Sequence, residues 1–165
     1  MDTAITSLIV IAVLLLAVLT TSEHYFSSQD AILESWREME ERLGERARTD
    51  LSPVGAQTIS SGSVVSVTLR NDGDTRLADF DQWDVILEYD GSDYACHVAW
   101  YPYGSGQNEW SVYDISPDAF DPDILNPGEE VVIWVSVSPS VAVSTTNRTT
   151  IATPNGIATS TVFTR

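Results

Sequence analysis

The sequence predicts an α+β chain, in which a long N-terminal α-helix is followed by an antiparallel β-sandwich head. Three observations predict this fold class. The first 49 residues contain no proline and include a long uncharged, apolar segment. From residue 50 onward, short alternating stretches rich in Val, Thr and Ser are separated by Gly, Pro, Asn and Asp. These later residues lack a helical repeat. We therefore expect a helical tail over residues 1–49 and a head domain over residues 50–165.

The segment from Ala4 to Thr21 is uncharged and would be apolar on every side of a helix. Its 18 residues would span roughly 27 Å at ~1.5 Å per residue, just enough to cross a bilayer. Such a helix has to be buried in lipid or in protein. Seven of its residues are our candidates for packing between tails in a filament core: Ile5, Leu8, Ile9, Ala12, Leu15, Leu16 and Leu19.

Three interpretations of this segment are open. A secretory signal peptide needs a basic start and a small-residue cleavage site, and this segment has neither. A membrane anchor normally has flanking Lys or Arg, and the first cation is Arg37. A mature chain whose basic leader has been removed explains the missing cation. In that case the helix first lies in the membrane and later packs against copies of itself.

The helical pattern continues beyond the apolar segment to Arg48, which favours the third interpretation. Apolar residues recur there at steps of four, three, four and four, and so form one narrow stripe. The stripe consists of Ile32, Trp36, Met39, Leu43 and Ala47. Three of these, Trp36, Met39 and Leu43, are our candidates for packing between tail and head. A membrane anchor followed by a stalk is the alternative, since periodicity alone cannot separate the two.

The head is expected to contain seven or so short strands. They are predicted over residues 63–70, 83–89, 94–101, 109–115, 131–137, 148–153 and 157–164. Turn sequences such as Asn71–Asp74, Asp90–Gly91 and Asn155–Gly156 separate several of them. Strands at this spacing without intervening helices favour an immunoglobulin-like sandwich.

The chain is strongly acidic, with 24 Asp and Glu against 8 Lys and Arg and a net charge of −16. Residues 50–165 hold 16 acids and 4 Arg, a net of −12, and residues 1–49 hold 8 acids and 4 Arg, a net of −4. A nucleic-acid partner is excluded, because such binding needs clustered cations. The single cysteine, Cys96, excludes an internal disulfide framework.

No catalytic, cofactor-binding or metal site is predicted, so we expect a protein that is not an enzyme. Cys96 and His97 are neighbours in an expected strand, where adjacent side chains point to opposite faces and cannot form a catalytic pair. We expect Cys96 to be a small buried hydrophobe. The aspartates at 114, 118, 121 and 123 are expected to form a solvated acidic loop, with Ca²⁺ binding as the alternative.

Two further features concern the surface of the head. Asn147-Arg148-Thr149 is an N-glycosylation sequon, so Asn147 is a candidate glycan acceptor. Aromatic residues gather at Trp100, Tyr101, Tyr103, Trp110 and Tyr113. We favour subunit packing for this cluster over a sugar-binding platform, because aromatic side chains anchor protein interfaces.

Three stretches of the chain resemble one known family. The tail stretch Ile5-Thr6-Ser7-Leu8-Ile9-Val10-Ile11-Ala12 is similar to the N-terminal signature of archaellins, with Thr6 and Ser7 in place of Gly and Thr. The head stretches Val67–Asp74 with Trp83–Leu87, and Leu125–Glu129, resemble strand and turn features of the same family. Archaellins, or archaeal flagellins, are type IV pilin-like filament subunits. Ile5 differs from the Glu that bacterial type IV pilins carry at this position.

The resemblance implies a structural subunit that polymerises with itself into an extracellular archaellum, a helical filament for swimming motility. It implies a prepilin-type peptidase and archaellum assembly and motor proteins as partners, with the tail in the membrane before assembly. Archaellins are often glycoproteins. Two alternatives are open: an adhesive type IV-like pilus subunit, and a membrane-anchored β-sandwich binding module.

Overall fold

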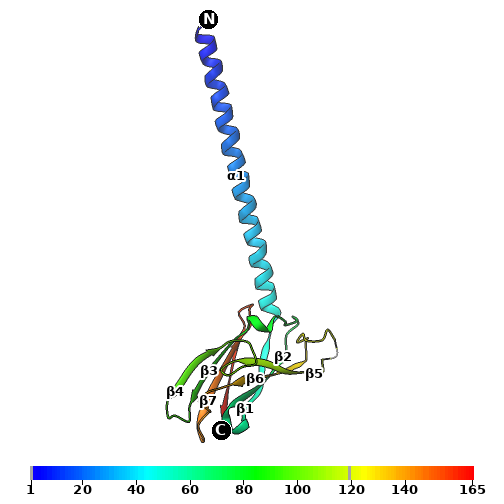
Figure 1. The fold of residues 1–165 in the computed structure, drawn as a ribbon. Helices are drawn as coiled ribbons and strands as arrows, with labels where there is room; N and C mark the ends of the chain where they lie inside the picture. Colours follow the sequence, from blue (N-terminus) through cyan, green and yellow to red (C-terminus); the bar gives the residue numbers. More distant parts are fainter. Residues whose placement is uncertain (1, 119) are drawn as a thin grey trace. The chain divides into compact units, whose positions relative to one another are not determined.

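The computed structural model describes residues 2–118 and 120–165, and their side chains except at positions 2, 4, 21–24, 26 and 27. Helix α1 (Asp2–Arg48) is followed by strands that run to the C-terminus (Figure 1). The strands are β1 (Leu51–Ile59), β2 (Val64–Asn71), β3 (Asp84–Asp90), β4 (Cys96–Tyr101), β5 (Trp110–Ser116), β6 (Glu130–Ser136), β7 (Thr146–Ala152) and β8 (Ala158–Thr164). Two short 3₁₀ helices, η1 (Ser60–Gly62) and η2 (Phe80–Gln82), lie between strands.

Helix α1 forms because its sequence contains no proline and a single glycine, Gly44. Arg46 and Arg48 lie in its last turn, where cations complement the helix dipole. The hydroxyl of Thr49 donates a 2.8 Å hydrogen bond to the carbonyl oxygen of Glu45, one of the carbonyls left over at the helix end. Pro53 follows within β1.

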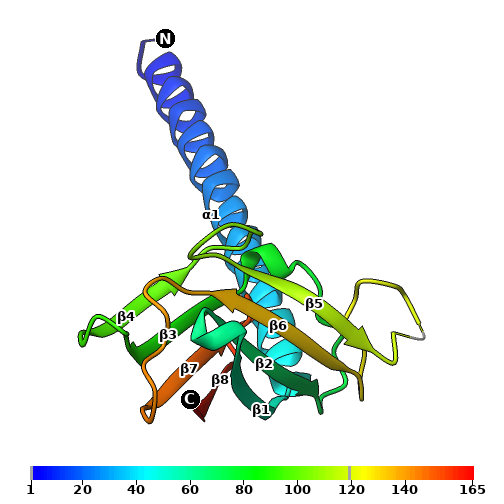
Figure 2. The ribbon, with the colours of Figure 1, turned by 60° about the horizontal axis from the view of Figure 1, so that its bottom comes forward.

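The strands form two four-stranded sheets with the orders β1-β2-β6-β5 and β4-β3-β7-β8. Every strand pair is antiparallel. Figure 2 shows β5, β6, β2 and β1 in one layer, with β4, β3, β7 and β8 in the other. The edge strand β1 contains a bulge between Pro53 and Gly55, which is consistent with proline being confined to edges and bulges.

One core lies between the two sheets. Residues alternate between buried and more exposed along β3, β6 and β7, as expected for strands with one face on a core. Trp83 and Trp110 are the largest side chains that are fully buried there. Much of the cluster consists of aliphatic residues from both sheets, such as Val67 and Ile133 from one and Leu87 and Ile151 from the other.

The fold class predicted from the sequence is wrong in the form stated above. The structure has two four-stranded antiparallel sheets, and a long helix carried by a distinct immunoglobulin-like sandwich is not shown. The chain divides into two compact units, Met1–Leu43 and Gly44–Arg165, so the last turn of α1 belongs to the same unit as the strands. The physical reason is hydrogen bonding: the carbonyl oxygens of Arg48 and Asp50 accept backbone bonds from residues 72–74.

Candidate functional site

The first candidate surface is the N-terminal half of α1. All seven residues predicted to pack between tails lie on this helix and are exposed there. The six large ones expose between 54% and 69% of their surface. Exposed apolar side chains in this number mark a surface that has to be covered by other molecules. The filament-core role of these residues stays a prediction.

Within the part of the chain that is described, no helix is both long and apolar enough to span a membrane.

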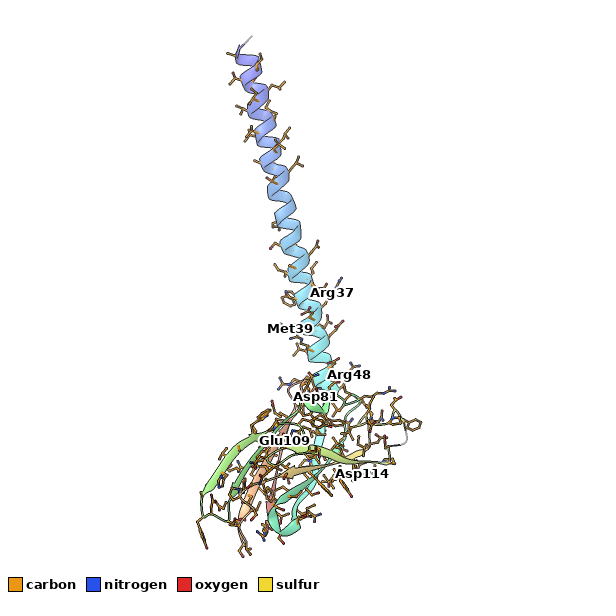
Figure 3. All side chains as sticks on the ribbon, in the orientation of Figure 1. Arg37, Met39, Arg48, Asp81, Glu109 and Asp114 are labelled. Atoms are coloured by element: carbon orange, nitrogen blue, oxygen red, sulfur yellow. The ribbon has the colours of Figure 1, made fainter. Side chains whose placement is uncertain are left out.

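The second half of α1 carries the narrow apolar stripe. Trp36, Met39 and Leu43 are all more than half exposed, and their predicted packing against the head stays a prediction. Figure 3 shows the side chains of Arg37 and Met39 leaving α1 on different sides. Charged residues on this half form exposed ion pairs along the helix, such as Arg42 with Glu38 at 3.7 Å. Such exposed pairs add at most a few tenths of a kcal/mol each.

A third candidate surface lies on the outer face of the sheet β4-β3-β7-β8. We call Ile86, Val98, Trp100 and Val162 the sheet-face patch, because these four exposed apolar residues lie on three strands of this face. Ile86 pairs directly with Trp100, and the indole nitrogen of Trp100 donates a 2.9 Å hydrogen bond to Asp84. Apolar residues at outward-facing strand positions favour a protein contact.

Sequence reasoning singled out Trp100 but missed the other three residues of this patch. A pattern that could have revealed these residues is nevertheless present in the sequence. Val98 and Val162 occupy exposed positions that alternate with less exposed ones, and such positions would ordinarily be polar in a half-exposed strand. They are recognised only when the strand register brings them onto one face.

The aromatic residues predicted to cluster are divided by the structure. Tyr101 and Trp110 belong to the core. Tyr103 packs edge to face on Trp110, with 5.0 Å between ring centroids. Tyr113 stacks on Trp134 at 3.6 Å on the sheet β1-β2-β6-β5, whereas Trp100 lies on the other sheet. Burial raises the pKa of the Tyr101 hydroxyl. No single flat platform results.

Asp93, in the loop between β3 and β4, forms a polar pair with His97 in the unit Gly44–Arg165, which we call the β unit. Nε2 of His97 lies 3.0 Å and 3.1 Å from the two carboxylate oxygens of Asp93, and the His97 ring stacks on Tyr89. The hydrogen bond from His97 is the main cause that lowers the pKa of Asp93. Cys96 is exposed, so its expected burial is wrong. It shares the outward face of β4 with the exposed residues Val98 and Trp100.

The carboxylates of the acidic stretch at 114–123 have different surroundings. Asp121 pairs with Arg76 at 2.7 Å, and Asp114 is exposed on β5. Among the residues that the structure describes, no group of three or more His, Cys, Asp or Glu is arranged to hold a metal ion.

Asn147 is buried on β7, with 3% of its surface exposed. Its side-chain oxygen accepts a 3.0 Å hydrogen bond from the backbone amide of Asp90, and its nitrogen donates to Thr145. The atom that would carry a glycan is therefore engaged inside the folded chain. Glycosylation at Asn147 stays a prediction of the sequon, and the fold opposes it.

Comparison with known proteins gives matches among solved structures. No protein family model and no curated protein matches the chain. The archaellum periplasmic stator protein FlaG from Sulfolobus acidocaldarius is 26% identical, with a TM-score of 0.56, over 70% of this chain and 99% of that chain. A chain of the periplasmic stator complex of FlaF and FlaG from the same organism is 25% identical, with a TM-score of 0.55, over 68% of this chain and 87% of that chain.

A third structure, the archaeal flagellum of Methanospirillum hungatei strain JF1, has a TM-score of 0.58 and 14% identity over 96% of this chain and 90% of that chain. At this identity the match shows the fold alone. Its coverage has to include most of α1, which takes up 47 of the 165 residues.

These likenesses identify an archaellum-related protein. They support an archaellum-associated structural role and a location at the cell surface or in the envelope. The prediction that the chain is an archaellin is finer than these likenesses support.

Proposed function

We propose that the chain is a structural, non-catalytic subunit of an archaellum-type machine, and that it acts in the cell envelope in the manner of a stator protein. The main observation in support of this proposal is the likeness to FlaG, which is 26% identical over 99% of that chain. The filament match has a similar TM-score but only 14% identity. The sequence likeness therefore favours the stator class over the filament class.

In this role the β unit binds a protein partner. The related stator structure is a complex of FlaF and FlaG. In the present chain the sheet-face patch offers an apolar surface for such a contact, because Trp100 is 56% exposed, pairs with the exposed Ile86, and follows the exposed Val98 on the same face of β4. Exposed Trp side chains in such patches are frequent anchors of binding energy. We propose another archaellum protein as the partner.

The second candidate is the filament subunit that the sequence predicts: an archaellin that polymerises with itself after a prepilin-type peptidase has removed its leader. One observation favours it, namely that the filament match extends over 96% of the chain. The exposed apolar half of α1 would then form the filament core. An adhesive pilus subunit would be built in the same way and would differ in leaving swimming unaffected.

Immunogold labelling of whole cells separates the two candidates. Antibodies against the β unit should label the cell envelope if the chain is a stator-type subunit. Labelling along the length of the surface filaments would support the filament candidate and reject the stator proposal.

A further inference from the structure

Helix α1 carries a seam with a seven-residue repeat. Its eleven positions follow one another at alternating steps of three and four residues, which is the spacing of a coiled coil. They are Leu8, Ile11, Leu15, Val18, Ser22, Tyr25, Gln29, Ile32, Trp36, Met39 and Leu43. The repeat thus continues without a break from the apolar half of the helix into the charged half.

The charged half shows that this spacing is selective. Seven charged residues lie between Tyr25 and Leu43, and none of them falls on the seam. Glu34 and Glu41 lie on the opposite side of the helix, and the ion pairs of Glu34 with Arg37 and of Glu38 with Arg42 stay off the seam as well. A surface that only faced water would not keep one line free of charge.

The apolar side chains of the seam are available to a partner. All nine expose between 52% and 69% of their surface. If each of these side chains exposes an area on the order of 100 Å², the seam offers roughly 900 Å² per helix. A standard protein interface buries ~800 Å² per partner. The seam is therefore large enough to form a stable pair of helices.

A polar layer occupies two positions in the middle of the seam. Nε2 of Gln29 donates a 2.7 Å hydrogen bond to the hydroxyl oxygen of Tyr25, and the two residues occupy neighbouring seam positions. Polar residues within a coiled-coil seam fix the register, because any shift places them against apolar neighbours. In an in-register pair of helices, the Tyr25–Gln29 layer of one helix lies against the same layer of the other.

We propose that two copies of this chain pair through the seam as a parallel, in-register coiled coil. The parallel orientation follows from the distribution of charge along α1. Residues 3–21 are uncharged, whereas residues 23–48 hold all the charged residues of the helix except Asp2. An antiparallel pair would set the apolar half of one helix against the charged half of the other, and a parallel pair matches like with like.

The pairing extends the proposed envelope role and rests on it, because the subunits of a filament would not pair in this way. Subunits of a helical filament are displaced along the filament axis, so identical residues of neighbouring helices do not meet. In a parallel, in-register pair they do meet. Contact between identical residues therefore separates this pairing from filament packing.

Disulfide cross-linking of the full-length chain in its native envelope tests the pairing. In a Cys96→Ser background, the seam variants Ile32→Cys and Met39→Cys are compared with the matched off-seam variants Glu34→Cys and Glu41→Cys. After mild oxidation, non-reducing gels measure the disulfide dimer. Each seam variant should yield at least ~10-fold more dimer than the off-seam variants, because a disulfide needs β-carbons about 3.8 Å apart.

Two outcomes would overturn the pairing: no dimer from either seam variant, or equal amounts of dimer from all four. A further variant, Trp36→Glu combined with Met39→Cys, should lose the dimer because it places a charge in the seam; retention of the dimer would also count against the proposal. Immunogold labelling reports the envelope role separately. Labelled envelopes without seam dimers would reject the pairing alone, and labelled filaments would reject the proposed function.

Discussion

The backbone amide of Asp74 donates a 2.8 Å hydrogen bond to the carbonyl oxygen of Arg48, which joins the loop after β2 to the last turn of helix α1. Gly73 makes this contact possible. A β-carbon at this position would collide with the backbone nitrogen of Asp50 and the carbonyl oxygen of Arg48. The connection therefore depends on backbone atoms that cannot move aside as a flexible side chain could.

Gly73→Ala is predicted to destabilise the β unit by about 1–3 kcal/mol, the usual cost of forcing an extra carbon into a filled site. Urea unfolding of the full-length chain in detergent, followed by tryptophan fluorescence, measures this change. Gly55→Ala is the matched control, because a β-carbon there meets nothing within 4 Å. Equal stability of the two variants would contradict the role assigned to Gly73.

Asn147→Ala is predicted to cost about 1–3 kcal/mol, since it removes a buried amide side chain and leaves the part-buried backbone amide of Asp90 without its acceptor. The same unfolding experiment measures the loss. Peptide mass spectrometry of the native chain should find Asn147 unmodified, because its side chain is buried and hydrogen-bonded. A glycan at this position on a stably folded chain would show that the site opens, contrary to the structure.

The pair of Asp93 and His97 predicts a dependence of stability on pH. Because the hydrogen bond from His97 lowers the pKa of Asp93 below 3.8 in the folded chain, the ionised carboxylate stabilises the fold above that pH. This contribution is lost as the pH falls through the lowered pKa. Thermal unfolding of the wild type should therefore decline more steeply below pH 3.8 than that of Asp93→Asn. Asp81→Asn, an exposed carboxylate elsewhere, controls for the loss of one charge, and identical acid profiles for wild type and Asp93→Asn would refute the pair's contribution.

Trp100→Ala is predicted to weaken binding of the archaellum partner by about 2 kcal/mol or more, as expected for an anchor residue. Swimming should decline while the thermal midpoint of the β unit changes little, because Trp100 is half exposed. Co-precipitation of archaellum proteins from cell envelopes provides the measurement. Tyr113→Ala removes a similarly exposed aromatic residue from the other sheet, and an equal loss of binding in this variant would argue against the sheet-face patch.

Several elements could be predicted from the sequence because their residues alternate regularly. The predicted stretch 83–89 corresponds to β3 and the stretch 157–164 to β8, each within one residue at either end. Strand β1 was missing from the prediction. Pro53 and Gly55 interrupt its pattern, and both are tolerated only because β1 is an edge strand with a bulge between them. Edge position is a property of the sheet that a local pattern does not reveal.

The candidate surfaces were predictable to different degrees. The exposed apolar residues of α1 follow directly from hydropathy, so Leu8 and Leu15 could be named from the sequence. The sheet-face patch depends on pairing between Ile86 and Trp100, which are 14 positions apart in the sequence. Asn147 lies in a surface-type motif, yet the register of β7 turns its side chain inward. A short motif does not record which face of a strand its residue occupies.

Mechanical shearing of cells, followed by mass spectrometry of the sheared filaments and of the remaining envelopes, tests the proposed envelope role most directly. The account predicts that the chain stays with the envelopes and is at most a trace component of the filaments. Its presence as the principal polypeptide of the sheared filaments would contradict the stator-type role and establish the filament subunit in its place.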